Sequence, residues 1–207
     1  MAGTGRRLTA AERRAQLLDA AVELAAGRDL VALSVQEIAA HAGVSEGLLY
    51  HYFPTKDALV LAAVQRAGEA MTAALDSAAA GPPLAALTAG LAAYLDHVQA
   101  DPTGWRALLQ ARSGPLAEVA AAVEDHARRI TLDRLGVADP SPAFATALDG
   151  WSALERQVCL DWLAHPDMPR AVVEDILLSS FSSCLQAAAR HDPQARRVLA
   201  DLESAQA

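Results

Sequence analysis

The chain has 207 residues, of which 53% are apolar and 20% charged, and its net charge at pH 7 is −8. The length allows one large domain or two, and the composition excludes a disordered chain. The acidic balance argues against binding nucleic acid over the whole surface, because neutralised phosphates supply most non-specific affinity. Charges or prolines interrupt each apolar run before the ~20 residues that a membrane span needs, and the N-terminus lacks an apolar signal core. We therefore expect a cytoplasmic protein with no membrane partner.

The N-terminal segment is basic and leads into the first predicted helix. Its arginines are Arg6, Arg7, Arg13 and Arg14, and Glu12 is the one acid before Asp19. Such a segment suits either local contact with DNA or a solvated tail. Thr9 and Glu12 have the spacing of a capping box, which predicts a helix running to about Ala26.

Two short helices joined by a tight turn are predicted next. Ser34 opens a second capping box, and Gly43 is the expected left-handed residue that ends this helix. Ser45 is a new N-cap, and the helix after it can extend no further than Phe53 because Pro54 follows. This pattern predicts a helix-turn-helix.

The rest of the chain is predicted to be helical, because strong helix formers fill it and aromatic residues make up only 4%. A long helix from Thr55 is expected to connect an N-terminal domain with the helix-turn-helix, residues 1–54, to a C-terminal domain, residues 55–207. Further helices are expected at about 84–100, 102–112, 116–135, 142–164 and 169–191, with a short tail helix after Pro193. The predicted fold class is all-α, with a three-helix N-terminal domain that contains the helix-turn-helix and a larger C-terminal helical bundle.

The second short helix gives the main indication of function. Leu49 and Phe53, four residues apart, form its buried side, which leaves Tyr50, His51 and Tyr52 to face outward or to flank the core. Two tyrosines and a histidine on so short a helix suit hydrogen bonds to phosphates, with their rings against sugar and base edges. A helix of this kind reads double-stranded DNA in the major groove, which is ~12 Å wide.

Three motifs lie close together here: Ser34-Val35-Gln36-Glu37-Ile38-Ala39, then Ala42-Gly43-Val44-Ser45, then Leu49-Tyr50-His51-Tyr52-Phe53-Pro54-Thr55-Lys56. Together they resemble the tetracycline-repressor (TetR) family of transcriptional regulators. The resemblance implies that Glu46, Gly47 and Leu48 point at base edges and that Gln36 reaches another, while Tyr50, His51 and Tyr52 mostly contact the DNA backbone. The DNA-binding residues expected are Ser34, Gln36, Ser45, Glu46, Gly47, Leu48, Tyr50, His51, Tyr52, Thr55, Lys56, Arg6 and Arg7.

Several of these assignments have an alternative. Lys56, the sole lysine of the chain, sits at a helix start that also favours a phosphate, or it is a solvated surface charge. Glu46 either accepts from a cytosine amino group or only favours the helix dipole. Arg6 and Arg7 either enter the minor groove or neutralise phosphates.

Reading two half-sites requires two copies of the short helix, so we expect a homodimer on a palindromic operator. Residues recurring at helical spacing on the last two long helices are the interface candidates: Phe144, Leu148, Trp151, Val158, Trp162, Val173, Leu177, Phe181 and Cys184. The resemblance also implies a pocket in the C-terminal bundle, where an unidentified small-molecule effector would release the DNA. Candidate lining residues, each also compatible with an ordinary core or surface position, are Tyr94, His97, Trp105, Leu109, His126 and Trp151.

Other functional classes have less support in the sequence. It contains no nucleophile elbow, phosphate-binding glycine loop, dinucleotide fingerprint or metal-ligand spacing, so we expect no enzyme, no catalytic residue, no metal and no cofactor. The alternative is a helical interaction module, or a small-molecule-binding protein without DNA readout. Cys159 and Cys184 are expected to be plain core or interface thiols, with a redox role as the alternative. Repression is assumed and not deduced, and neither effector nor operator can be read from these residues.

Overall fold

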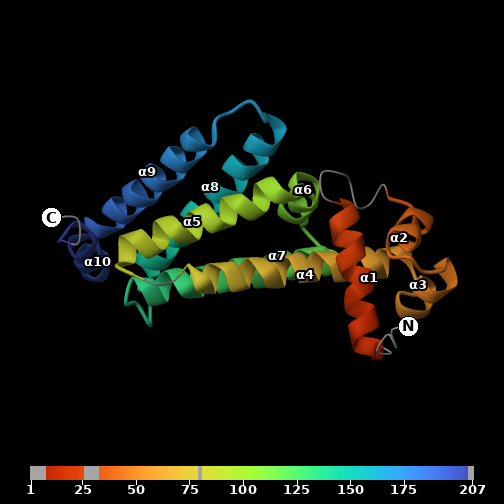
Figure 1. The fold of residues 1–207 in the computed structure, drawn as a ribbon. Coiled ribbons are helices and arrows are strands. Elements are labelled where there is room, and N and C mark those ends of the chain that lie inside the picture. Colours follow the sequence, from red (N-terminus) through yellow and green to blue (C-terminus); the bar gives the residue numbers. More distant parts are fainter. Residues whose placement is uncertain (1–7, 26–32, 79–80, 205–207) are drawn as a thin grey trace. The chain divides into compact units, whose positions relative to one another are not determined.

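The computed structural model describes residues 8–25, 33–78 and 81–204. Over these ranges the chain forms ten α-helices and no strand (Figure 1), which confirms the all-α prediction. The helices belong to two compact units, Met1–Ala67 and Gly68–Ala207. The division falls inside α4 (Lys56–Ser77), so this helix contributes residues to both units.

The first unit has short helices that begin at the caps expected from the sequence. Its helices are α1 (Ala10–Ala25), α2 (Val35–His41), α3 (Glu46–Tyr52) and the first part of α4. Thr9 and Glu12 exchange backbone-to-side-chain hydrogen bonds of 2.7 and 3.2 Å. Ser34 and Glu37 do the same at 2.9 and 3.1 Å. These reciprocal bonds satisfy backbone donors that a helix start would otherwise leave unpaired.

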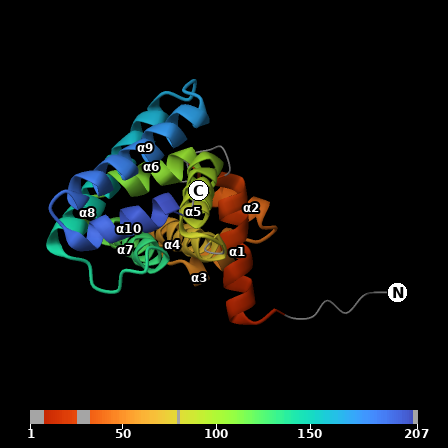
Figure 2. The same cartoon turned by 90° about the vertical axis from the view of Figure 1, so that its left-hand side faces the viewer.

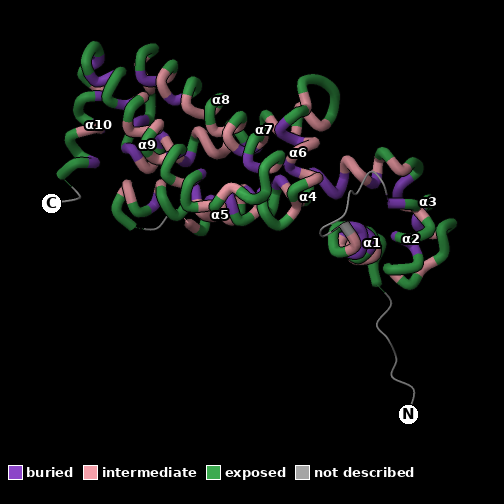
Figure 3. Tube along the Cα trace, turned by 90° about the horizontal axis from the view of Figure 1, so that it is seen from above, coloured by how far each residue is buried: buried purple, intermediate pink, exposed green. Residues whose placement is uncertain are grey.

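One apolar cluster holds the first unit together. It includes Leu17 and Ala21 from α1, Ile38 from α2, Leu49 and Phe53 from the α3 region, and Leu59 and Ala63 from α4. Along α2 and α3, a few buried residues lie between runs of exposed ones (Figure 3). Replacing a fully buried leucine here by alanine should cost about 2–5 kcal/mol, so the cluster fixes the orientation of α3 against its neighbours.

The second unit contains longer helices, most of which start at a proline. They are α5 (Pro83–Ala100), α6 (Pro102–Gln110), α7 (Gly114–Arg134), α8 (Pro142–Ala164), α9 (Arg170–Ala189) and α10 (Pro193–Ser204). Proline is tolerated at the first helical position because its missing N–H would be unpaired there in any case. The observed ends differ from the predicted ones by one or two residues, the usual uncertainty at helix ends.

The helix α9 packs closely on both α8 and α10 (Figures 1 and 2). Phe144 and Leu148 from α8 and Leu185 from α9 belong to their common core. The indole N–H of Trp151 donates to the carbonyl of Leu177 at 3.0 Å, so this large side chain is held without an unpaired polar atom.

Among the described helices, α4 has the length and mean hydropathy of a membrane span, which the sequence analysis did not expect. A third of the relevant window is buried, and Arg66 in α4 forms an ion pair of 2.6 Å with Asp19 of α1. Core helices of soluble proteins share the same length and composition, so these properties alone do not identify a span.

Candidate nucleic-acid interface and ligand cavity

The turn between α2 and α3 depends on one residue with left-handed backbone. Gly43 has a φ of 67°, which glycine adopts without the steric cost that a Cβ would bring. The N–H of Val44 donates to the carbonyl of Ala39 at 2.9 Å and satisfies the end of α2. Ser45 then caps α3 and accepts from the N–H of Leu48 at 3.2 Å. The start of α3 is therefore fixed relative to α2.

The helix α3 has a buried apolar side and an exposed polar one. Leu49 and Phe53 are 1% and 2% exposed, whereas Tyr50 is 46% exposed. Among the DNA-binding candidates, Ser34, Gln36, Ser45, Glu46, Gly47, Tyr50, His51 and Thr55 are exposed, and Leu48 and Lys56 are half-buried. Arg6 and Arg7 lie outside the described residues. This division between the two sides is what a helix needs if it is to enter a major groove while staying attached to its domain.

Tyr52 differs from the other aromatic residues of α3. It is half-buried and packs against the apolar cluster of the first unit. The ring of His51 meets it edge to face, with the ring centroids 5.2 Å apart. The sequence left open whether Tyr52 faces outward or flanks the core, and in the structure it flanks the core. Its ring contacts the exposed His51.

Side chains of α1 and α4 border the end of α3. The guanidinium carbon of Arg14 lies 4.8 Å from the centroid of the Phe53 ring, so the basic start of α1 contacts the helix-turn-helix directly. Thr55 caps α4 by accepting from the N–H of Ala58 at 3.0 Å, and Lys56 is the first residue of that helix. The positive end of the α4 dipole and the lysine favour an anion at the same place.

A cavity of about 110 Å³ lies in the second unit, with lining residues from α4 to α9. Tyr94, Trp105, Leu109 and Trp151, predicted from the sequence, are among its lining residues. His97 and His126, also predicted, are not. The Nδ1 of His97 lies 3.0 Å from the carbonyl oxygen of Ala93 in its own helix, and His126 lies 3.1 Å from the Asp76 carboxylate. These polar partners hold both imidazoles away from the lining.

Sequence analysis missed the charged residues of the cavity, which are Glu124, Arg128, Arg134, Glu155 and Arg156. Burial and, to a smaller extent, nearby Glu124 raise the pKa of Glu155 while Arg156 lowers it, and together they bring it from 4.5 to about 8. The Glu155 carboxyl makes no hydrogen bond or ion pair with the residues that the structure describes. At pH 7 it is therefore mostly a neutral acid facing an apolar space.

Tyr94 and Cys159 form a hydrogen-bonded pair near Glu155. The tyrosine hydroxyl donates to the thiol sulfur, and burial raises the pKa of Tyr94 well above its usual value. Burial also raises the pKa of Cys159, to about 12. A thiol with so high a pKa is not a nucleophile at neutral pH, so Cys159 is a core residue. Within the described parts of the chain, no group of three or more His, Cys, Asp or Glu is suited to a metal.

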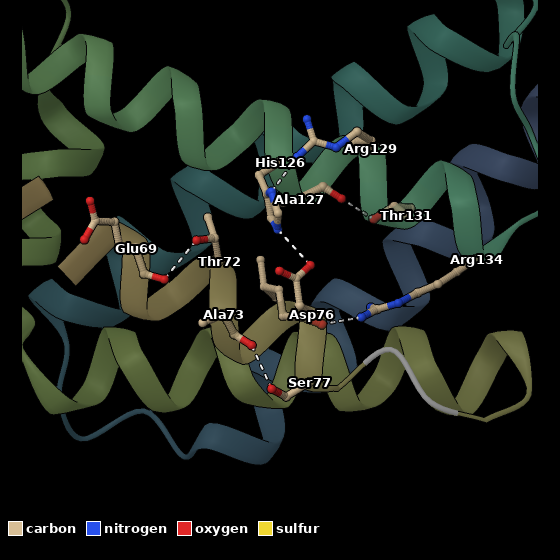
Figure 4. A network of polar contacts seen from close by, with 11 residues as sticks. Glu69, Thr72, Ala73, Asp76, Ser77, His126, Ala127, Arg129, Thr131 and Arg134 are labelled. Carbon is tan, nitrogen blue, oxygen red and sulfur yellow. Dashed lines mark hydrogen bonds and ion pairs between the residues drawn. The ribbon is translucent and has the colours of Figure 1, made fainter. Parts of the chain in front are cut away.

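Arg134, in the last turn of α7, connects the cavity to the C-terminal end of α4. Its guanidinium donates to the carbonyls of Leu75 in α4, at 2.7 Å, and Ala86 in α5, at 3.0 Å. Two turns earlier on α7, His126 contacts Asp76 of α4 (Figure 4). A change in the cavity that moves α7 would therefore also act on the last two turns of α4.

The dimer candidates lie mostly inside the protomer. Phe144, Leu148, Trp162, Val173 and Leu177 are buried within it, and Trp151, Val158, Phe181 and Cys184 are half-buried. Helical spacing identifies these residues as apolar stripes, but core and interface stripes have the same period, so their place at a dimer interface stays a prediction. The large apolar residues that α8 and α9 leave exposed are Leu154, Val172 and Ile176.

Comparison with known proteins covers both units. Residues 17–63 match the model of the bacterial regulatory proteins of the tetR family, and residues 83–184 match a tetracyclin repressor-like C-terminal domain. The crystal structure of a TetR-family transcriptional regulator from Streptomyces coelicolor is 32% identical, with a TM-score of 0.84, and the match covers 94% of this chain and 91% of that one.

Two further similar proteins are named for what they do. The multidrug binding protein EbrR, solved in complex with ethidium, is 25% identical with a TM-score of 0.62, and the match covers 83% of this chain and 99% of that one. The HTH-type transcriptional activator FasR of Mycolicibacterium smegmatis is 35% identical over 108 residues, 51% of this chain and 49% of that protein. The chain thus matches about half the length of this curated relative.

Proposed function

The chain belongs to the TetR family of bacterial regulatory proteins, and on that premise we propose that it is a ligand-responsive repressor that binds a palindromic operator as a homodimer. A small molecule in the cavity of the second unit would release it from DNA. Its place would be the bacterial cytoplasm, on the nucleoid while it is bound to DNA. The observation that carries the proposal is the exposed polar and aromatic side of α3, fixed from behind by Leu49 and Phe53.

In this proposal the first turn of α3 contacts the bases. Glu46 and Leu48 would meet base edges, and Gly47 would let the helix backbone come close to the duplex. A Cβ added at Gly47 meets no protein atom within 4 Å, so nothing in the fold itself explains the absence of a side chain. Tyr50 and His51 would bind phosphates on one side of the groove, and Lys56 with the start of α4 would bind a phosphate beyond the end of α3.

The proposed dimer contact uses the exposed side of α8 and α9. Leu154, Val172 and Ile176 are between 36% and 45% exposed, and a group of large apolar side chains on two adjacent helices suits a contact with a second copy. The residues that sequence analysis chose would support these helices from the protomer side.

Release by an effector requires that the ligand bind the two states with different affinity, typically by ~1–3 kcal/mol. Arg134 supplies a physical connection, because it lines the cavity and holds the Leu75 carbonyl at the end of α4. The same helix begins next to α3, at Lys56. The similarity to EbrR, which was solved with ethidium, supports small-molecule binding. The sign of regulation is a separate question, since FasR is named an activator.

The test begins with selection of bound sequences from random DNA by the purified protein, which should return a palindrome. Mobility shifts with that DNA then compare Tyr50→Ala and Lys56→Ala with Val22→Ala, which removes an exposed apolar side chain from α1. The first two variants should lose at least tenfold in affinity, and Val22→Ala should bind like the wild type. An unchanged shift for Tyr50→Ala and Lys56→Ala would favour the alternative, a helical interaction module or a small-molecule-binding protein without DNA readout.

A further inference from the structure

We propose that the cavity of the second unit takes a small aromatic cation whose charge is neutralised by the carboxylate of Glu155. This inference rests on the proposed function, because it names the chemical class of the effector. It is carried by three features of the cavity: the Glu155 carboxyl, which has no hydrogen bond or ion pair with the described residues, the aromatic walls, and the volume.

Glu155 is the acid in the lining that is available to a ligand. The other lining acid, Glu124, is exposed and pairs with Arg156 at 2.6 Å. Glu155 makes no hydrogen bond or ion pair with the described residues. An acid without a partner in an apolar cavity gains most from a ligand that brings a positive charge to it.

The arginines of the lining are engaged elsewhere, which argues against an anionic ligand. Arg128 donates to Asp149 at 3.0 Å, Arg156 pairs with Glu124, and Arg134 donates to two backbone carbonyls. The Nε atoms of Arg134 and Arg156 have no partner, but protein atoms enclose both of them completely. Each of these guanidinium groups thus already has an acceptor, whereas the Glu155 carboxyl has none among the described residues, which favours a ligand of positive charge.

Aromatic rings form the remaining walls. Tyr94 and Trp105 meet edge to face with centroids 5.9 Å apart, and Trp151 and Phe181 do so at 5.1 Å. All four line the cavity. The faces of such rings attract cations, and they also hold apolar rings. Carboxylate and aromatic walls together suit an aromatic cation better than a neutral hydrocarbon.

The volume sets the size of the ligand. An apolar protein cavity of ~150 Å³ holds one benzene molecule, and this cavity measures about 110 Å³. A ligand of one ring is therefore the largest that this cavity takes, and only with some widening of the lining, whereas a fused polycyclic molecule requires a much larger expansion.

Binding of a permanent cation should release one proton. Below pH 8 the Glu155 carboxyl is mostly protonated, so it must pass its proton to solvent when it becomes the counter-ion of the ligand. Affinity should then rise about tenfold per pH unit up to about pH 8, where the free carboxyl ionises by itself, and level off above it. The titratable and charged groups around this carboxyl are Tyr94 from α5, Glu124, Arg128 and Arg134 from α7, and Arg156 and Cys159 from α8.

The experiment compares three one-ring probes on the full chain by calorimetry and tryptophan fluorescence. Phenyltrimethylammonium carries a permanent charge, tert-butylbenzene has the same shape without charge, and benzenesulfonate carries the opposite charge. The cation should bind at least tenfold more tightly than the hydrocarbon at pH 8, and benzenesulfonate most weakly. Only the affinity of the cation should rise between pH 6 and 8.

Glu155→Gln keeps the size of the side chain and removes its charge. This variant should bind phenyltrimethylammonium at least tenfold more weakly, without pH dependence, and should bind tert-butylbenzene as before. The matched control is Glu118→Gln, the same change at an exposed α7 position outside the lining, which should bind every probe like the wild type. Unchanged hydrocarbon binding shows that the Glu155→Gln cavity is intact.

Benzenesulfonate binding more tightly than the cation, cation binding that survives Glu155→Gln, or no binding of any probe would each overturn the inference. Mobility shifts on the selected DNA separate this failure from that of the proposed function. A protein that binds its operator but not the cation refutes the ligand class alone. One that binds the cation but no DNA refutes the DNA-binding regulator alone.

Discussion

Glu155 is the residue at which the requirements of folding and binding conflict most clearly. Its pKa of about 8, against an ordinary 4.5, means that the folded chain retains this proton to a higher pH than the unfolded chain does. The stability that the neutral acid contributes is complete below about pH 4.5 and is lost as the pH rises towards 8. The cavity is thus maintained at some cost in stability at neutral pH.

The first prediction concerns this cost. Glu155→Gln should be more stable than the wild type at pH 8, because the amide does not have to be ionised or kept protonated. The difference in free energy of unfolding between the variant and the wild type should grow between about pH 4.5 and 8 and remain constant above pH 8. Urea unfolding over this pH range measures it. A difference that does not vary with pH would show that the Glu155 carboxyl is solvated in the folded protein.

Gly47 gives a second prediction at the scale of the residue. Gly47→Ala should leave the fold intact and stabilise it by up to about 1 kcal/mol, since alanine favours a helix interior and its Cβ meets no protein atom within 4 Å. Affinity for the selected DNA should nevertheless fall, because the methyl group would stand between α3 and the duplex. Thermal unfolding and mobility shifts on the same preparation test both effects. Equal DNA affinity would mean that this part of α3 does not approach the bases.

Residue types alone predicted most of the aromatic lining of the cavity but not its charged residues. Tyr94, Trp105 and Trp151 could be predicted because large aromatic residues in a helical bundle are either core or lining. Glu155 was missed, although it shares a helical face with Trp151 and Cys159 at a spacing of four residues. An acid within an apolar stripe was the available signal. His97 and His126 were chosen for their chemistry, but local polar partners engage both.

Helix boundaries were the most predictable part of the structure, because caps and prolines act locally. Thr9, Ser34 and Ser45 start helices whether or not the rest of the chain is known, and Gly43 ends one. The packing of helices in the second unit is not encoded in this way. Hydrogen bonds such as those from Arg134 to the carbonyls of Leu75 and Ala86 join positions far apart in the sequence. No local sequence pattern predicts them.

A third prediction tests the packing of α5 against α7. A Cβ added at Gly90 would lie 2.4 Å from the terminal nitrogen Nη1 of Arg134. That nitrogen is held by the Ala86 carbonyl, so the side chain cannot move without losing hydrogen bonds worth about 1.5–3 kcal/mol each. Gly90→Ala should therefore destabilise the protein by about 1–3 kcal/mol in urea unfolding.

The matched control for Gly90→Ala is Gly150→Ala in α8. A Cβ added at Gly150 meets no protein atom within 4 Å, so this variant should be as stable as the wild type or slightly more stable. Equal effects of the two substitutions would show that Arg134 moves aside freely and does not hold α5 and α4 together.

At the scale of the whole molecule, a fourth prediction concerns assembly. Ile176→Glu places a charge among the exposed apolar residues of α8 and α9 and should convert the proposed dimer to a monomer. Val22→Glu makes a comparable change at a side chain of similar exposure, 40% against 41%, but on α1, and should leave the dimer intact. Sedimentation at micromolar protein concentration distinguishes the two. A dimer that survives Ile176→Glu would place the contact on another surface.

The sequence alone does not distinguish a proposed dimer contact from the core, for a physical reason. The α8 and α9 helices are apolar on the side that faces the protomer core as well as on part of the side that faces outward. Leu177 is fully buried while Ile176, its neighbour in sequence, is 41% exposed. The apolar pattern shows that both helices carry apolar residues on more than one side, but it does not show which of these residues the same chain buries.

The shortness of α3 limits how much sequence one copy can distinguish. Its seven residues span about 10 Å, the length of roughly three stacked base pairs. A sequence of so few base pairs recurs by chance throughout any genome. A single copy of the chain would therefore be bound mostly at non-target sites. In the proposed dimer, selectivity depends on two such sites at a fixed spacing, so a fall in protein concentration that dissociates the dimer should reduce selectivity between promoters as well as their occupancy.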